Sequence, residues 1–325
     1  MLGNPDRPVG GIAVRPPPGV ELRPLGRGDL EIAVHLAREQ RKLPPAGDLA
    51  PLRIRYERLI NSPDVAGFAA VEGGEVAGLA IAEFRRRLNF ASFEGWLSDL
   101  FVRPASRGRG SGSALAQAIV AEWRLRGGHR IQAQVPAQAE AARATLRRLG
   151  FEEWMLDFRL APVPPAIGDP AAPDGVSLRP LGPADGDAVT PLIAEFGPWR
   201  SPMPERLEAV MRSYAEHARS VAAGDAGSMV AEREGVVVGV CTLEWRAPFW
   251  DDRLEGWIPD LVVTEPLRGR GIGRALLAEA IRAAAERGAA AVTLESGLQR
   301  ESAHRLYRNA GFAQTGTTHV LRREA

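Results

Sequence analysis

The sequence has a single cysteine, a single lysine and no long apolar run, and each scarcity excludes a class of protein. Cys241 is the sole cysteine among 325 residues, so an internal disulfide framework is excluded and a small buried core residue is expected. Lys42 is the sole lysine, which excludes a P-loop, because that motif needs a glycine-flanked lysine on the phosphates. No apolar run reaches the length of a membrane span, and residues 1–18 lack the hydrophobic core of a signal peptide. We therefore expect a cytoplasmic protein that binds no membrane.

Net charge is also low, at +1, so no overall field attracts nucleic acid or an anionic membrane. Four of the histidines lack the spacing of metal ligands, and no metal site is expected; they are His35, His129, His217 and His319. Hydrophobic residues make up 45% and charged residues 25%, which is ordinary for a globular chain. A length of 325 residues predicts about two domains, each long enough to bury its own core.

A long internal repeat supports that division. Residues 107–112 (RGRGSG) return as residues 268–273 (RGRGIG), an offset of 161 (268 − 107). Residues 94–102 (EGWLSDLFV) return at the same offset as 255–263 (EGWIPDLVV), and a Gly-Phe pair returns at 150 and 311. A glycine-rich turn that opens a helix after a strand presents backbone N–H groups to phosphate oxygens. The repeat therefore predicts a duplicated nucleotide- or cofactor-binding unit.

Similar segments, VELRPLG at 20–26 and VSLRPLG at 176–182, begin the two halves. Between them, residues 161–175 contain five prolines and two glycines and read as a semi-rigid linker. The predicted division is a tail over 1–19, a first domain over 20–160, the linker over 161–175, and a second domain over 176–325.

Hydrophobic periodicity predicts the same mixed α/β (α+β) sheet in both halves, with antiparallel hairpins first and one β–loop–α–β unit after. In the first half we expect a hairpin over 68–84, a helix over 112–126 and a strand over 131–135. In the second half we expect strands near 176–179, 229–231, 236–244, 257–263, 291–294 and 317–321, and helices near 185–195, 204–222, directly after the glycine loop, and 301–309.

The loop and its surroundings resemble the GCN5-related N-acetyltransferase (GNAT) superfamily. The family signature, Arg/Gln-x-x-Gly-x-Gly/Ala between a bulged strand and a helix, is matched by Arg107-x-x-Gly110-x-Gly112 and by Arg268-x-x-Gly271-x-Gly273. The segment Ala303-x-x-Leu306-Tyr307-x-x-x-Gly311-Phe312 resembles the family's downstream region. The resemblance covers most of each half and implies two tandem GNAT-like domains that use acetyl-CoA.

The resemblance also implies where acetyl-CoA lies. Its diphosphate would rest on the loop amides at the positive end of a helix, and its pantetheine would lie along the preceding strand. In the second half the implied contacts are Leu261, Val262, Val263, Arg268, Gly269, Arg270, Gly271, Ile272, Gly273, Arg274 and Arg300. In the first half they are Leu100, Phe101, Val102, Arg107, Gly108, Arg109, Gly110, Ser111 and Gly112.

Tyr307 matches the tyrosine that the family places near the acetyl-CoA sulfur. Because tyrosine has a pKa of ~10 and a thiol ~8.5, full proton transfer would cost roughly 2 kcal/mol, so a hydrogen bond to the departing thiolate is the expected role. The first half has Leu146 at this position (307 − 161) and is expected to bind CoA weakly and not to turn over. The family's asparagine near the start of this helix is replaced by Arg300 and by Ala139.

Glu255 stands 13 residues before Arg268 (268 − 255) and resembles the general base of the histone-acetylating branch. Asp260 is an alternate base, Glu94 and Asp99 are their counterparts in the first half, and a partly solvated strand-end carboxylate is the competing interpretation of Glu255. Four tryptophans with nearby carboxylates could form a wall for a cationic amine, or could belong to the core beside a solvated hairpin tip. They are Trp199, Trp245, Trp250 and Trp257, with Glu244, Asp251 and Asp252.

The leading hypothesis is an acyl-CoA-dependent N-acetyltransferase, catalytic in its second half, that acts on a small-molecule or peptide amine as a monomer (an internal pseudo-dimer) or a homodimer. The alternative is a degenerate tandem protein that senses CoA without turnover. A dinucleotide-binding fold fits less well, because Leu276 stands where its third glycine is needed and hairpins precede the loop.

Overall fold

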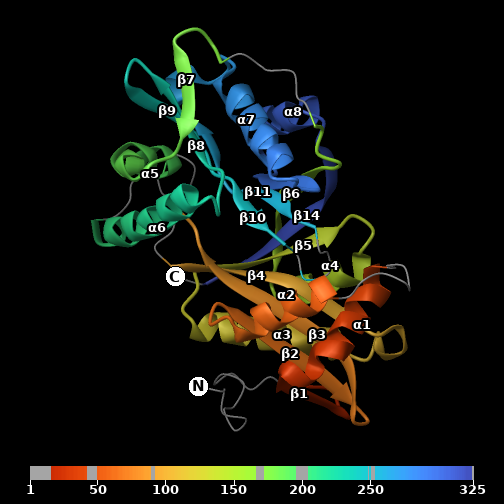
Figure 1. Cartoon of the computed structure of the whole chain (residues 1–325). Coiled ribbons are helices and arrows are strands. Elements are labelled where there is room, and N and C mark those ends of the chain that lie inside the picture. Colours follow the sequence, from red (N-terminus) through yellow and green to blue (C-terminus); the bar gives the residue numbers. More distant parts are fainter. Residues whose placement is uncertain are drawn as a thin grey trace.

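The computed structural model describes residues 16–41, 50–88, 92–165, 172–194, 204–247, 249 and 253–323. The first half contains β1 (Val20–Pro24), α1 (Leu30–Arg41), α2 (Ala50–Asn61), β2 (Val65–Glu72), β3 (Glu75–Arg86), β4 (Phe93–Val102), α3 (Ser111–Leu125), β5 (Arg130–Pro136), α4 (Glu140–Arg148) and β6 (Glu152–Leu160). The second half contains β7 (Val176–Pro180), α5 (Gly186–Ala194), α6 (Pro204–Ala223), β8 (Met229–Arg233), β9 (Val236–Cys241), β10 (Glu244–Arg246), β11 (Glu255–Ile258), β12 (Leu261–Val263), α7 (Ile272–Glu286), β13 (Ala291–Gly297), α8 (Glu301–Asn309) and β14 (Ala313–Arg322). The expected mixed α/β fold with two similar halves is confirmed (Figure 1).

Two strands of the second half are shorter than the sequence predicts. The strand expected over 236–244 is split into β9 and β10, and the one over 257–263 is split into β11 and β12. Proline has no N–H for a strand ladder, and Pro259 stands where the unbroken β4 has Ser98. The next residue, Asp260, donates its backbone N–H to the Thr242 hydroxyl at 2.9 Å. The break therefore divides the strands between two sheets, of ten and four strands.

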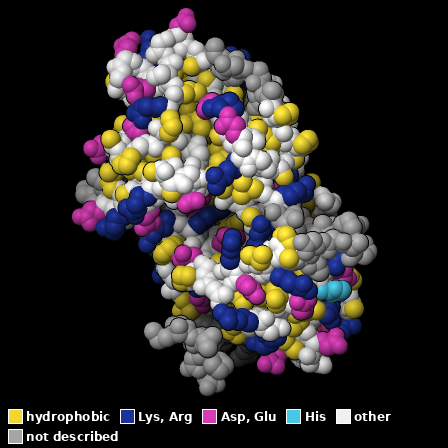
Figure 2. Space-filling view, viewed as in Figure 1, with side chains coloured by type: hydrophobic (Ala, Val, Ile, Leu, Met, Phe, Trp, Pro, Cys, Tyr) yellow, Lys and Arg dark blue, Asp and Glu magenta, His cyan; other side chains and the backbone are white. Residues whose placement is uncertain are grey.

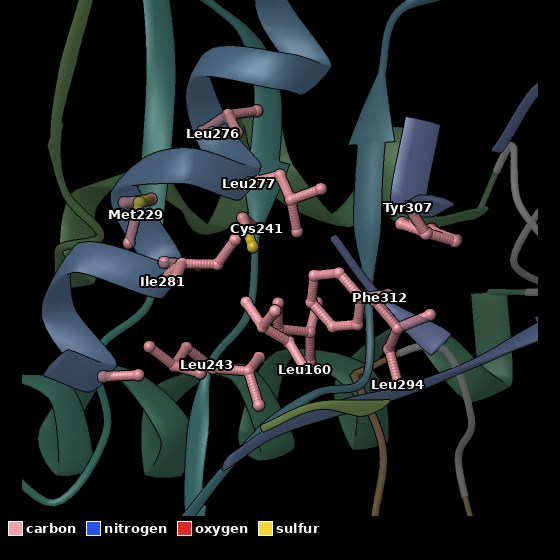
Figure 3. Packing of buried hydrophobic residues seen from close by; sticks show 14 of the residues in the cluster. Leu160, Met229, Cys241, Leu243, Leu276, Leu277, Ile281, Leu294, Tyr307 and Phe312 are labelled. Carbon is pink, nitrogen blue, oxygen red and sulfur yellow. The ribbon is translucent and has the colours of Figure 1, made fainter. Parts of the chain in front are cut away.

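The last strand of each half lies in the sheet of the other half. The ten-stranded sheet runs β1-β2-β3-β4-β5-β14-β6-β13-β11-β10, so β14 pairs with β5 of the first half and β6 pairs with β13 of the second. Figure 1 shows β14 passing from the upper half toward the lower one. Leu160 of β6 packs in the core under α7 (Figure 3). Leu321 of β14 packs against the core under α3. The predicted boundaries at 20–160 and 176–325 thus follow the repeat, while the sheet interlocks the two halves.

A second exchange joins the halves beside this sheet. Phe249 of the second half packs among residues of α1, α2, β3 and β4, 5.7 Å from the ring of Tyr56. Leu88 of the first half occupies the matching place (249 − 88 = 161) in the cluster of α5, α6, β8 and β9. Each buried side chain of this size contributes about 1.5–3 kcal/mol. The loops after β3 and β10 are therefore held by the opposite half.

At the centre of the molecule, residues of one half contact residues of the other at positions related by the repeat. The Arg85 guanidinium lies 3.7 Å from the ring centre of Trp257, and its counterpart Arg246 lies 4.7 Å from that of Trp96 (offsets 246 − 85 and 257 − 96, both 161). In the sheet, Thr318 donates a 2.5 Å hydrogen bond to its own counterpart, Asp157. Burial and the neighbouring Glu295 raise the pKa of Asp157 to about 8, so this carboxyl carries a proton near neutral pH.

Candidate active site

The second glycine loop forms a tight turn at the start of α7. Gly269 and Gly271 have φ angles of 77° and 90°, which favour glycine, and Gly271 is the N-cap residue of the helix. The Arg268 side chain folds back and donates to the Val263 carbonyl at 2.9 Å. Arg270 and Arg274 are exposed, and neither has a carboxylate partner within the described ranges. Backbone N–H groups, the helix dipole and these cations together suit a diphosphate.

The strand ahead of this loop has an open edge. β11 pairs with β13 through Glu255–Ile258, whereas β12 pairs only with β9 in the described part of the chain. A gap therefore opens between β12 and β13, with Leu261 and Val263 along one side. An extended ligand can bind such an edge as an added strand, so the residues fit the pantetheine chain of acetyl-CoA.

Tyr307 of α8 lies in the core cluster that borders this gap (Figure 3). Its ring is 5.5 Å from that of Phe158 and 6.1 Å from that of Phe312, and only 6% of the residue is exposed. Burial raises the pKa of Tyr307, and the nearby Cys241 adds to this shift, so the hydroxyl keeps its proton. No hydrogen-bond partner of that hydroxyl is found among the residues that the structure describes. A buried, protonated donor is thus available to a ligand.

Arg300 interacts electrostatically with Tyr307 and with two other residues of the site, Arg268 and Asp260. It is the N-cap residue of α8, at the position of the family's missing asparagine, and it is half-buried. Burial lowers the pKa of Arg300, with Arg268 acting in the same direction, while Tyr307 and Asp260 oppose that shift. These four side chains therefore share one electrostatic environment. His304, on the same helix, is within 3.0 Å of the Gly297 carbonyl and has a structural contact there.

The two candidate bases of the second half have different surroundings. Glu255 is buried and pairs with Arg159 of β6 at 2.5 Å. Asp260 follows the strand break, is 2% exposed, and accepts from Arg87 at 3.2 Å and from Thr242 at 3.3 Å. Asp260 lines the cleft described next, whereas Glu255 is not among the lining residues. Asp260 thus lines the cleft and, like Tyr307, acts to raise the pKa of Arg300.

A cleft of about 880 Å³ lies between the two halves. Its first-half wall comes from α2 and the end of β3, and its second-half wall from α6, β10 and Asp260. His217 of α6 lines the cleft within 2.7 Å of the Ser228 hydroxyl. Burial lowers the pKa of His217, although Glu244 and Asp260 act to raise it, so the imidazole stays neutral near pH 7. A volume of this size suits a small-molecule ligand.

Of the two tryptophans in this hypothesis that the structure describes, Trp245 lines the cleft and Trp257 does not. Trp257 is fully buried, and its two nearest cations are Arg85 and Arg246 of the chain itself, at 3.7 and 4.5 Å. Its indole N–H donates to Glu295 at 2.8 Å. Trp245 is half-buried and does line the cleft. The other residues of this hypothesis lie outside the described residues: Trp199, Trp250, Asp251 and Asp252.

The first glycine loop has the same backbone as the second. Gly108 and Gly110 have φ angles of 77° and 95°, and Arg107 donates to the Val102 carbonyl at 3.0 Å. β4 separates from β5 after Leu97, so Leu100–Val102 also borders a gap. Leu146, at the position equivalent to Tyr307, is 2% exposed and fills this gap's core with an apolar side chain.

A carboxylate distinguishes the first loop. Glu72, at the end of β2, accepts from Ser111 at 2.6 Å and from Ser106 at 2.9 Å, and lies 3.8 Å from Arg109. The Ser111 hydroxyl, with Ser106, holds the pKa of Glu72 below its usual range, so the side chain is negatively charged. The second half has Arg233 at the equivalent position (72 + 161), so the Glu72 carboxylate has no counterpart there.

Two residues of the site, Arg87 and His217, were not predicted from the sequence. Arg87 reaches Asp260 from the other half, and His217 joins the cleft from a helix 43 residues before that aspartate (260 − 217). The run Arg85-Arg86-Arg87 is visible in the sequence, but its contact with the second half is not. In the described residues, no group of His, Cys, Asp and Glu could hold a metal ion. Within the same residues, no helix is long and apolar enough to cross a membrane.

The glycine turns, the gaps beside them and the duplicated sheet define a protein built from two units of one α/β fold. The family model for the acetyltransferase (GNAT) family matches residues 33–151 and 193–312. The chain therefore belongs to the GNAT family, in tandem form, and is an N-acetyltransferase, as the resemblance predicted.

Similar proteins agree with this assignment. The mycothiol acetyltransferase of Amycolatopsis mediterranei is 30% identical over 89% of this chain and 91% of its own length. That of Acidothermus cellulolyticus is 31% identical over 70% and 71%. A GCN5-related N-acetyltransferase from Sphaerobacter thermophilus has the same fold, with a TM-score of 0.65 and 22% identity over 95% of this chain and 97% of that one. A tandem GNAT protein from the clavulanic acid biosynthesis pathway aligns with a TM-score of 0.61, 17% identity and 93% and 98% coverage.

Proposed function

We propose that the second half transfers an acetyl group from acetyl-CoA to the primary amine of a small molecule, by direct attack in a ternary complex. The observation that carries this proposal is a buried, protonated Tyr307 beside a strand gap and a cationic glycine loop. The first half has the loop but has Leu146 in place of the tyrosine. The relatives named mycothiol acetyltransferase support a small-molecule acceptor related to the one in that name.

The roles follow from the surroundings of each group. The N–H groups of residues 269–274 and Arg270 bind the diphosphate, and the edge of β12 binds the pantetheine amides. The amine nitrogen enters from the cleft and forms a bond to the acetyl carbon, the C–S bond breaks, and CoA leaves as its thiolate. The Tyr307 hydroxyl donates a hydrogen bond to the thiolate as it leaves, and the amine proton passes to a carboxylate, directly or through water.

For the base, the contacts favour Asp260 over Glu255. Both carboxylates pair with an arginine, Asp260 with Arg87 and Glu255 with Arg159. Asp260, however, lines the acceptor cleft and shares Arg300 as a charged neighbour with Tyr307, whereas Glu255 does not line the cleft. We propose Asp260 as the group that receives the proton. Replacement by Asp260→Asn should lower kcat in the CoA-release assay by about 100-fold or more, while Glu255→Gln should preserve most of it. The reverse pattern would return the role to Glu255.

The first half is proposed to be non-catalytic. Besides lacking the tyrosine, it has the Glu72 carboxylate hydrogen-bonded to Ser111 at the first turn of α3, where it weakens the attraction of the loop for a diphosphate. Its function in this proposal is structural, because it provides β6 to the second sheet and one wall of the cleft.

The test measures free CoA with a thiol reagent while acetyl-CoA and a library of amines are supplied. Arg268→Glu should abolish CoA release, because it places a negative charge beside the second loop. The matched variant Arg107→Glu should largely preserve it. Equal losses in both variants would reject a catalytic second half with a silent first half, and binding of acetyl-CoA without release by any amine would indicate a sensor instead.

A further inference from the structure

The cleft between the halves has two walls of opposite charge. The first-half wall has five arginines, Arg55, Arg58, Arg85, Arg86 and Arg87, and two acids, Asp64 and Glu83. The second-half wall has four acids, Glu216, Asp225, Glu244 and Asp260, with His217. Figure 2 shows basic and acidic side chains gathered along the waist between the two halves. A molecule inside this cleft therefore meets a positive surface on one side and a negative surface on the other.

The innermost arginines of the first wall already have partners. Arg87 bonds Asp260 at 3.2 Å, and Arg85 bonds Glu94 at 3.1 Å. Arg130 also donates a 2.5 Å hydrogen bond to Glu94. Although burial acts to raise the pKa of Glu94, the three guanidinium groups hold it well below its usual range. These arginines are engaged within the protein and are not available to the anion of a ligand.

The outer arginines differ. Arg58 and Arg86 are exposed, and neither has a carboxylate partner in the ranges that the structure describes. The Arg86 guanidinium lies 4.4 Å from the ring centre of Phe93, which also lines the cleft and restricts where the cation can lie. Guanidinium groups form bidentate hydrogen bonds with carboxylates and phosphates. Two such groups at the cleft rim form a binding surface for an anion.

We propose that the acceptor is a small amine that also has an anionic group, with its ammonium end toward Asp260 and Glu244 and its carboxylate or phosphate bound by Arg58 and Arg86. This inference rests on the proposed function, because it concerns the acceptor of the same transfer reaction. The acidic wall would repel a polyanion, so the ligand is a small zwitterion and not a nucleic acid. The first half thus supplies substrate specificity to the chemistry of the second.

The test uses matched pairs of amines that differ only in the anion. Glucosamine is compared with glucosamine 6-phosphate, and 4-aminobutanamide with 4-aminobutanoate, in the CoA-release assay. The anionic member of at least one pair should have a KM at least tenfold lower, and 0.5 M salt should reduce that ratio. The double variant Arg58→Gln/Arg86→Gln should bring the ratio close to one. The control Arg124→Gln, an exposed arginine on α3 away from the cleft, should retain the ratio.

Calorimetric titration of the same four compounds onto the CoA-bound protein gives the ranking without turnover. Tighter binding of an anionic member, lost in the double variant, would support the inference even if no amine were acetylated, in which case only the proposed function fails. Equal affinities and equal KM values within both pairs would overturn the inference while leaving acetyl transfer intact. A ratio that persists in the double variant would also overturn it, because the anion would then be bound elsewhere.

Discussion

Arg87→Met would break the contact between the first half and the strand break of the second. Arg87 is 8% exposed and donates to the Pro259 carbonyl at 2.9 Å and to Asp260 at 3.2 Å. Its other terminal nitrogen lies 3.6 Å from Glu94. Methionine preserves much of the apolar stem but removes the charge, so Asp260 would remain in the interior without its cation.

Breaking a buried ion pair costs about 3–5 kcal/mol, because the remaining charge is uncompensated. We expect the lower end, about 3 kcal/mol, since Thr242 still donates to Asp260 and two arginines remain around Glu94. Because Asp260 is the proposed base, its displacement should also lower kcat/KM for acetyl transfer by about tenfold or more.

Urea denaturation and CoA-release kinetics measure the two effects. In Arg87→Met, a second substitution, Asp260→Asn, should recover part of the lost stability, because it removes the unpaired charge. The exposed control Arg124→Met should change the free energy of unfolding by less than about 0.5 kcal/mol. Arg87 does not stabilise the strand break if Arg87→Met lowers the free energy of unfolding no more than the control does. The same follows if the losses from Arg87→Met and Asp260→Asn are additive.

Three further predictions concern single groups. Tyr307→Phe should lower kcat about 10- to 100-fold in the CoA-release assay with little change in the KM for acetyl-CoA, since a hydrogen bond to a charged group contributes about 1.5–3 kcal/mol; an unchanged kcat would remove its role. In the folded state Asp157 keeps its proton up to about pH 8, whereas in the unfolded chain it releases that proton near pH 4. The free energy of unfolding should therefore fall as pH rises from about 5 through 8. Asp157→Asn should reduce that slope in urea titrations at several pH values, and an identical slope would contradict the raised pKa. Glu72→Gln retains a side chain that Ser111 can bond while removing its charge, and should add a second, weaker acetyl-CoA site detectable by calorimetry; a titration identical to that of the wild type would exclude Glu72 as the cause of weak binding.

The repeat was sufficient to predict the two halves, both glycine loops and the positions of Tyr307 and Leu146. It could not predict that β6 and β14 exchange sheets. Because the halves are similar, a strand has nearly the same apolar pattern whether it pairs within its own half or with the other. Leu160 and Leu321 would each be buried in either arrangement, so sequence periodicity does not distinguish the two topologies.

The unpredicted exchange also explains which site residues sequence reasoning could not assign. Arg159, the partner of Glu255, belongs to β6 and reaches that glutamate only because β6 lies beside β13. Arg87 reaches Asp260 through a loop that packs into the opposite half. Contacts between residues 96 (255 − 159) and 173 (260 − 87) positions apart depend on tertiary packing and leave no local pattern in the chain.

Calorimetric titration of acetyl-CoA into the purified protein shows directly which glycine loop binds it. We expect one tight site per chain, lost in Arg268→Glu and retained in Arg107→Glu. Two sites of equal affinity, no binding at all, or equal loss in both variants would contradict a second loop that binds the diphosphate for catalysis beside a first loop occupied by Glu72.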